Sequence, residues 1–376
     1  MNGFDNIKRL VIKVGTSTLT YSTGKLSFHR IESIIRQIAD LHNQGMEVIL
    51  VTSGAVGAGI GRLGLTARPK TIPQKQAVAA IGQCILMQHY EKLFSEYGQV
   101  VAQVLLTAED IALRKRYLNA RNTLIKIFEY GAIPIINEND TVAVDELKVG
   151  DNDRLSALVA SLIHADLLVI LSDIDGLYNK DPRKHKDAQF IPVVKEITEE
   201  LEALKGEAGS SMGTGGMHTK IEAGKIATSS GIPMIIADGS RENVIKDIIN
   251  GEKIGTLFIP CVDKLDSRRR WIAFNLNIPG IIKVDDGARD ALLKRGKSLL
   301  PSGVLSIEGN FDAGDVVSII DTNAKEFARG IVNYSYQELM KIKGLSTKDI
   351  ENVLGHKYYD EVIHRDNLVC LTTVRR

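Results

Sequence analysis

The chain is 376 residues long, with 44% hydrophobic residues, 25% charged residues and a formal net charge of +1. This length allows two domains with ordinary cores, and the composition excludes a disordered or fibrous protein. The near-zero charge gives no global reason to expect a nucleic acid or membrane partner. Three dispersed cysteines, with no apolar leader or bilayer-length apolar segment, lead us to expect a cytoplasmic protein.

Two predicted strands near the start each run into small and polar residues. Residues 10–14 form a β-branched run that ends in Gly15-Thr16-Ser17-Thr18, and residues 47–52 lead into the glycine-rich segment 53–61. We interpret both segments as turns that present backbone N–H groups, which suits phosphate. Lys13 lies inside the first strand, and taken alone it favours an edge strand whose lysine reaches solvent.

The glycine-rich segment does not carry a familiar nucleotide motif. It lacks the G-x-G-x-x-G order of dinucleotide sites, and no G-x-x-x-x-G-K-[ST] phosphate loop occurs in the chain. Gly296-Lys297-Ser298 ends like such a loop, but Ala291 stands where its first glycine belongs. Any nucleotide site must therefore be of another kind.

Strands and helices alternate through the next hundred residues. Apolar spacing predicts helices at 28–43, 74–97 and 117–130, and strands at 100–106, 132–136 and 166–171. This alternation predicts a three-layer α/β/α fold with a mainly parallel central sheet.

A polar segment at 137–153 follows one of these buried strands and precedes a helix predicted at 155–163. It contains six acids and three asparagines. Open α/β sheets place their sites at the carboxyl ends of strands, but Asp and Asn also favour plain solvated turns. The segment alone is therefore compatible with a metal site, with a site for a cationic group, or with no site.

A second informative segment, Gly209-Ser210-Ser211-Met212-Gly213-Thr214-Gly215-Gly216-Met217-His218-Thr219-Lys220, precedes a helix predicted at 217–230. A cation in a first helical turn is locally unfavourable, so we expect Lys220 to have a negatively charged partner. Loop amides, the helix N-terminus and Lys220 together predict an anion site, although a plain surface loop is nearly as good an interpretation. A strand at 233–237, a helix at 244–249 and a strand at 255–259 complete this domain.

The composition changes after Pro260. We expect a first domain at 1–260, a linker at 261–275 and a small, mainly β domain at 276–376. Short β-like runs occur at 280–284, 303–307, 315–320 and 327–332, with a helix at 287–295. The charge of this part is nearly balanced, whereas domains that grip phosphate backbones are usually more basic.

Several motifs, in order along nearly the whole chain, together resemble one family. They are Val11-Ile12-Lys13-Val14-Gly15-Thr16-Ser17, Val51-Thr52-Ser53-Gly54-Ala55, Asn137-Glu138-Asn139-Asp140, Lys148-Val149-Gly150-Asp151-Asn152-Asp153 and Gly213-Thr214-Gly215-Gly216-Met217. The set resembles the glutamate 5-kinase family, which has the amino acid kinase fold. The tail resembles that family's PUA domain through Val284-Asp285-Asp286-Gly287-Ala288, Ser298-Leu299-Leu300-Pro301 and Ile363-His364-Arg365-Asp366.

The resemblance implies ATP-dependent phosphorylation of the γ-carboxylate of L-glutamate, the first step of proline biosynthesis. It implies catalytic roles for Lys13, Asp153 and Lys220, with Asp153 orienting the two lysines. The implied ATP-binding residues are Lys13, Ser172, Asp173, Thr214, Gly215, Gly216, Met217, His218, Thr219 and Lys220. The implied glutamate-binding residues are Ser53, Asp140 and Asn152, with Asn137 as a neighbour; residues 142–149 are expected to cover glutamate.

The resemblance also implies Mg²⁺ on the ATP oxygens with few direct protein ligands, feedback inhibition by proline, and a homo-oligomer, either dimer or tetramer. Ser172 and His218 depart from the family, where threonine and serine are common. One alternative is another member of the fold, acting on aspartate, acetylglutamate or carbamate. A second alternative is an RNA-binding or regulatory protein that acts through the PUA-like domain.

Overall fold

In a computed structural model, the chain falls into two compact units, Met1–Asp263 and Lys264–Arg376. The structure describes residues 7–21, 26–143, 152–180, 182, 185–198, 201, 216–260 and 278–371. The predicted linker at 261–275 lies outside the described residues. The two units are described separately below.

The first unit is built on an eight-stranded sheet in the order β3-β4-β2-β1-β5-β9-β10-β8. Its strands are β1 (Arg9–Val14), β2 (Glu47–Thr52), β3 (Val101–Leu106), β4 (Ile133–Glu138), β5 (Leu167–Ser172), β8 (Val193–Val194), β9 (Met234–Asp238) and β10 (Thr256–Phe258). The six strands from β3 to β9 are mutually parallel, and β10 pairs antiparallel with β9. The predicted α/β/α fold with a mainly parallel sheet is therefore confirmed.

The prediction of an edge strand around Lys13 is wrong. β1 is an inner strand that pairs with β2 on one side and with β5 on the other. Lys13 is only 4% exposed and does not reach solvent. A buried lysine is tolerated because a buried carboxylate lies beside it, as the site below shows.

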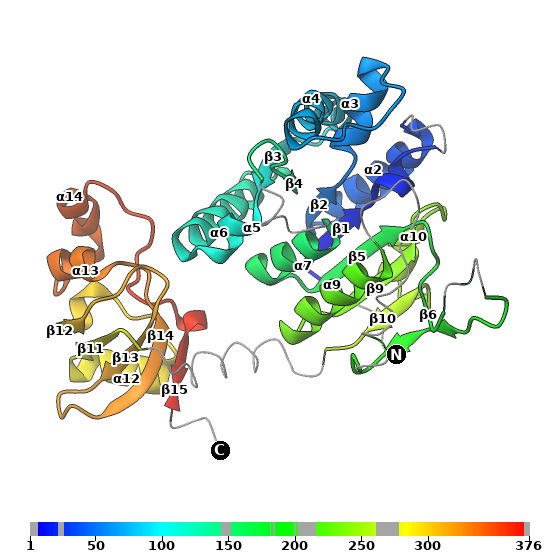
Figure 1. Cartoon of the computed structure of the whole chain (residues 1–376). Coiled ribbons are helices and arrows are strands. Elements are labelled where there is room, and N and C mark those ends of the chain that lie inside the picture. The colour runs from blue at the N-terminus through cyan, green and yellow to red at the C-terminus, as the bar shows by residue number, and fades with distance from the viewer. Residues whose placement is uncertain are drawn as a thin grey trace. The chain divides into compact units, whose positions relative to one another are not determined.

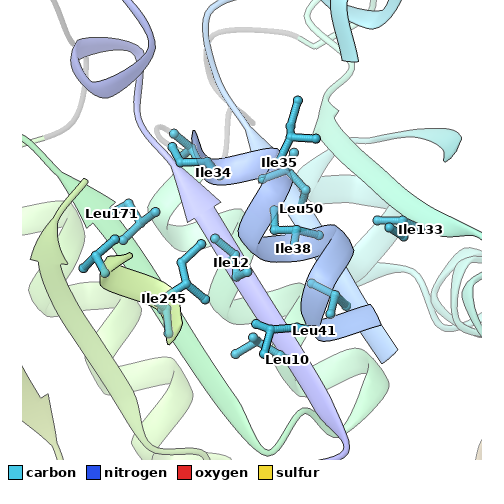
Figure 2. Close-up of a cluster of buried hydrophobic side chains, with 14 of the residues drawn as sticks. Leu10, Ile12, Ile34, Ile35, Ile38, Leu41, Leu50, Ile133, Leu171 and Ile245 are labelled. Atoms are coloured by element: carbon cyan, nitrogen blue, oxygen red, sulfur yellow. The ribbon is translucent and has the colours of Figure 1, made fainter. Parts of the chain in front are cut away.

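One face of the sheet is covered by α2 (Phe28–Asn43), α4 (Ile72–Glu96) and α10 (Val244–Ile249). Leu10, Ile12 and Val14 of β1 point to this face and pack against α2 and α10. Figure 2 shows this cluster, in which Ile34, Ile35, Ile38 and Leu41 of α2 lie over the strands. The helical spacing of these α2 residues places them on one stripe, which explains why the segment forms a helix here.

The opposite face is covered by α6 (Arg114–Glu129), α7 (Asn152–Ile163) and α9 (Met217–Ser229). Val11 of β1 belongs to this second core, because side chains alternate between the two faces of a strand. Lys13, two residues further on, shares the side of Val11. The pleat of β1 therefore directs Lys13 towards α7 and α9.

The glycine-rich segment 53–61 was expected to be a turn, and this prediction is wrong after Gly54. Residues Ala55–Leu63 form the helix α3. A Cβ atom on Gly59 would lie 2.1 Å from the carbonyl oxygen of Val78, and one on Gly82 would lie 1.7 Å from that of Ala55. The glycines Gly59 and Gly82 thus serve the close packing of α3 on α4 rather than chain reversal.

Short elements complete the first unit: α1 (Thr16–Leu19), α5 (Ala108–Ala112), and the strand pair β6 (Leu177–Tyr178) with β7 (Phe190–Ile191). The segment after β1, expected to be a turn, is thus one helical turn. None of the described helices is long and apolar enough to cross a membrane.

The second unit contains a five-stranded sheet in the order β12-β11-β13-β14-β15. Its elements are β11 (Gly280–Val284), α12 (Asp286–Arg295), β12 (Val304–Gly309), β13 (Val316–Ile320), β14 (Glu326–Ile331), α13 (Tyr336–Ile342), α14 (Ile350–Leu354) and β15 (Leu368–Cys370). They enclose a separate hydrophobic core that includes Ile282, Val317 and Leu339. The mainly β prediction is confirmed, while α13, α14 and β15 were not predicted.

Candidate active site

A single buried carboxylate joins two buried lysines in the first unit. Oδ1 of Asp153 lies 2.5 Å from Nζ of Lys13, and Oδ2 lies 3.1 Å from Nζ of Lys220. All three side chains are nearly inaccessible to solvent, with Asp153 completely so. The predicted catalytic residues, which are far apart in the sequence, therefore meet at one point of the fold.

The fold explains why they meet. Lys13 is the penultimate residue of β1, Asp153 lies in the first turn of α7, and Lys220 lies in the first turn of α9. α7 packs against β1, β2, β4, β5 and α9, so its first turn lies beside the carboxyl ends of the central strands. A carboxylate is favoured at that position by the partial positive charge of a helix N-terminus.

The two lysines of the cluster determine the charge state of its one carboxylate. Burial alone would raise the pKa of Asp153, but the charges of Lys13 and Lys220 outweigh it and hold the pKa well below its usual range. Asp153 therefore stays ionised at any physiological pH. Two ammonium groups and one carboxylate leave a net positive charge, which favours an anionic ligand beside them.

The N-terminus of α9 belongs to the same cluster. Oγ1 of Thr219 lies 2.9 Å from Oδ2 of Asp153 and 2.9 Å from the carbonyl oxygen of Gly216, the N-cap residue of α9. Nε2 of His218 lies 3.6 Å from Oε1 of Glu222, so its imidazole is turned along the helix. Met217 packs against the core beneath α9. Thr214 and Gly215 lie outside the described residues.

Ser172 and Asp173 follow directly at the carboxyl end of β5, the strand beside β1. Ser172 is buried, and its hydroxyl donates to Oδ1 of Asp173 over 3.2 Å. Asp173 itself is exposed. The backbone N–H of Gly15 donates to Leu171 over 3.3 Å, which joins the end of β1 to the end of β5. These residues thus share the sheet edge of the lysine cluster.

A second group, made of amides, adjoins the first through α7. Nδ2 of Asn152 lies within hydrogen-bond distance of three oxygens: the Thr52 carbonyl (2.9 Å), Oγ of Ser53 (2.8 Å) and Oδ1 of Asn137 (3.0 Å). Nδ2 of Asn137 in turn donates to Oε1 of Gln83 over 2.8 Å. Ser53 and Asn152, both predicted to bind substrate, therefore share one network with Asn137.

Asp140 lies half-buried in the turn that follows β4. In the same turn, backbone N–H groups of Val142 and Ala143 both donate to the carbonyl oxygen of Asn139. The rest of the polar segment, residues 144–151, lies outside the described residues, so its predicted covering role is not tested. Among the residues that the structure does describe, no three His, Cys, Asp or Glu side chains lie so that they could hold a metal ion.

The sequence prediction missed three side chains of α4 that contact this region. Nε2 of Gln76 donates to the Ala143 carbonyl (3.4 Å), Oε1 of Gln83 accepts from Asn137, and the hydroxyl of Tyr90 lies 2.6 Å from Oγ1 of Thr52. These residues recur at intervals of seven, which places them on one face of a helix. That spacing is visible in the sequence and could have identified them.

Comparison with known proteins identifies both units. Residues 8–238 match the model of the amino acid kinase family, and residues 280–354 match the PUA domain. A glutamate 5-kinase from Thermoanaerobacter sp. (strain X514) is 58% identical over 363 residues, covering 96% of this chain and 98% of that protein. Glutamate 5-kinases from Caldanaerobacter subterraneus subsp. tengcongensis (59%; 96% and 98% covered) and Moorella thermoacetica (54%; 97% and 96% covered) are similar over comparable lengths.

Among solved structures, a UMP kinase from Bacillus anthracis aligns with 68% of this chain and 97% of its own, at 17% identity and a TM-score of 0.47. The family model matches well over half of the present chain, and the relatives match nearly all of it. The chain therefore belongs to the amino acid kinase family, with a PUA domain after the kinase domain.

Proposed function

We propose that this chain transfers the γ-phosphoryl group of ATP to the γ-carboxylate of L-glutamate, giving L-glutamyl 5-phosphate and ADP. The observation that carries the proposal is the bridge from Asp153 to Lys13 and Lys220 at the carboxyl edge of the sheet. The similarity of the chain to glutamate 5-kinases over nearly its whole length supports glutamate as the substrate.

The lysines suit the chemistry because phosphoryl transfer depends mainly on positioning and on stabilising negative charge. An oxygen of the γ-carboxylate attacks the γ-phosphorus, and the bond to the β-phosphate oxygen breaks, so ADP leaves with the electron pair. Lys13 and Lys220 neutralise charge on the transferred group, while Asp153 fixes where their ammonium groups lie. No general base is needed, since the γ-carboxylate is already ionised near neutral pH.

The residues around the bridge also bear on ATP and its metal ion. The cluster offers cations and a helix N-terminus, which hold phosphate, and its carboxylate is already paired with two lysines. Mg²⁺ would therefore be held mainly by ATP oxygens and water, where it supplies further charge neutralisation. Ser172, Asp173 and the residues from Thr214 to Lys220, of which Met217 to Lys220 begin α9, would hold the nucleotide.

The amide network suits the amino acid. Asn152 has an acceptor, Oδ1, with no hydrogen-bond partner among the described residues. An α-ammonium group needs hydrogen-bond acceptors, and the carboxylate of Asp140 would also accept from it. Ser53 and Asn152 would then hold the glutamate backbone while Lys13 and Lys220 hold phosphate.

The resemblance further implies inhibition by proline, self-association and a cytosolic location, and it leaves the ligand of the PUA domain open. Proline titration of the kinase reaction and the sedimentation of the purified full chain test the first two. A salt-dependent gel shift with tRNA tests whether the PUA domain binds RNA.

The test is a glutamate-dependent kinase assay in which hydroxylamine traps the acyl phosphate as γ-glutamyl hydroxamate. We expect hydroxamate and ADP in equal amounts with L-glutamate, and far less with L-aspartate or N-acetyl-L-glutamate. Lys220→Met should lower kcat strongly, whereas Asn152→Ala should mainly raise the KM for glutamate. Absence of hydroxamate from the purified full chain, or preference for another acceptor, would overturn the proposal.

A further inference from the structure

The long helix α4 carries a polar face that the proposed reaction does not yet use. Gln76, Gln83 and Tyr90 lie on this face at intervals of seven residues, and each contacts the end of a central strand or the turn after it. Gln83, the middle residue, contacts the side-chain amide of Asn137, whereas Gln76 contacts a backbone carbonyl and Tyr90 contacts a hydroxyl. This contact between two side-chain amides is partly buried.

Backbone groups fix the orientation of both asparagine amides in the network. The N–H of Glu138 donates to Oδ1 of Asn137 over 2.9 Å, so Nδ2 of Asn137 must face Gln83. The carbonyl oxygen of Thr52 accepts from Nδ2 of Asn152, so Oδ1 of Asn152 must be the free acceptor. Reversing either amide would bring two donors or two acceptors together. The hydrogen bonds of this series therefore all point one way: Asn152 donates to Asn137, and Asn137 donates to Gln83.

Gln83 is held firmly enough to control this order. Its neighbour Gly82 packs so closely on α3 that any side chain there would collide with Ala55. About two helical turns further along the same face, the buried hydroxyl of Tyr90 bonds to Oγ1 of Thr52, whose carbonyl oxygen accepts from Asn152. α4 is thus fixed to β2 and α3 on both sides of Gln83.

We propose that Gln83 is a positioning residue for the amino acid substrate. Its Oε1 holds the Asn137 amide, which holds Asn152 so that the free Oδ1 of Asn152 is presented to the α-ammonium group. This inference rests on the proposed function. It adds to it a residue that affects glutamate binding without touching glutamate itself. Gln83 acts through Asn137 and has no role in phosphate binding.

Gln83→Met tests the proposal, because methionine nearly preserves the volume of glutamine and removes its acceptor. We expect the KM for L-glutamate to rise about 5- to 100-fold, as loss of a buried hydrogen bond predicts. The KM for ATP and the melting temperature with bound ATP should change little. The inhibition constant of glutarate, which lacks the ammonium group, should change much less than the KM for glutamate. Gln88→Met, on an exposed position of α4, is the matched control and should leave every value unchanged.

A double-mutant cycle with Asn137→Ala decides whether Gln83 acts through Asn137. We expect Gln83→Met to cause no further loss in the Asn137→Ala background, because the two residues belong to one series. Equal losses in both backgrounds, or an unchanged glutamate KM in Gln83→Met, would overturn the positioning role. A parallel rise in the glutarate constant would do the same. If the unmodified chain makes no γ-glutamyl hydroxamate, the proposed function fails instead, so the two failures are distinguishable.

Discussion

Replacing Asp153 by asparagine should reveal how much the buried bridge contributes to stability. Each ammonium–carboxylate pair contributes roughly 4 kcal/mol of attraction at a separation of about 4 Å and an effective dielectric constant of about 20. Desolvation offsets most of that gain in the intact cluster. Asp153→Asn removes the carboxylate that lies 2.5 Å from Nζ of Lys13 and 3.1 Å from Nζ of Lys220, so the attraction of both ammonium groups to it is lost and their mutual repulsion remains.

The expected cost is about 3–5 kcal/mol, the usual cost of removing one partner of a buried ion pair. For a unit of this size, it should lower the melting temperature of the ligand-free protein by roughly 10 °C. Differential scanning calorimetry of the full chain measures it, with the second unit as an internal reference. The double variant Lys13→Met/Asp153→Asn is the matched control and should recover part of the loss, because one of the two mutually repelling charges is gone.

The same cluster predicts a pH dependence. The pKa of Asp153 is lower in the folded state than in the unfolded chain. Its stabilisation is therefore present above the unfolded pKa, about 4, and is lost as pH falls below it. Asp153→Asn should flatten this acid-side loss. A melting temperature of Asp153→Asn equal to that of the unmodified chain at pH 7 would refute the reasoning about charge compensation.

Two further variants test other parts of the structure. Gly82→Ala should destabilise the kinase domain by about 1–3 kcal/mol, because its Cβ would collide with the Ala55 carbonyl. Gly61→Ala, with open space around it, should instead stabilise α3 by about 0.5–1 kcal/mol. Denaturant unfolding measures the free energy of unfolding of both variants, and equal effects would contradict the packing role of Gly82. Burial raises the pKa of Tyr334 to about 12, and its hydroxyl donates to the Tyr359 carbonyl. Tyr334→Phe should cost the second unit about 1–3 kcal/mol, and the unmodified unit should lose stability as pH rises from about 10 to 12; a variant as stable as the parent would contradict this.

The strands of the kinase domain could be predicted because parallel sheets buried on both faces leave continuous apolar runs, as at 47–52 and 167–172. Segment 53–61 was misread because glycine permits both turns and close helix contacts, and only the position of α4 distinguishes them. Lys13 was misread for a similar reason, since the strand's neighbours decide whether its end is exposed.

The residues alone predicted an anion site at Lys220, but the set of residues that act together could be predicted only from the resemblance to a known family. That resemblance named Lys13, Asp153 and Lys220, which the structure brings together. It did not name Gln83, whose contact with Asn137 spans 54 positions of the chain. The seven-residue spacing of Gln76, Gln83 and Tyr90 places them on one face of a helix, but it does not say against which strand that face packs.

The start of α7 has a consequence for the alignment of the two substrates. Asn152 belongs to the amide network and Asp153 to the lysine cluster, yet they are consecutive residues. Their Cα atoms are separated by about 3.8 Å, a length set by covalent bonds that no fluctuation of the fold can stretch. The peptide bond between Asn152 and Asp153 therefore keeps the distance between the amide network and the lysine cluster fixed at this point. Under the proposed function, the offset between the residue that holds glutamate and the residue that positions the phosphate-binding lysines is therefore set by the main chain.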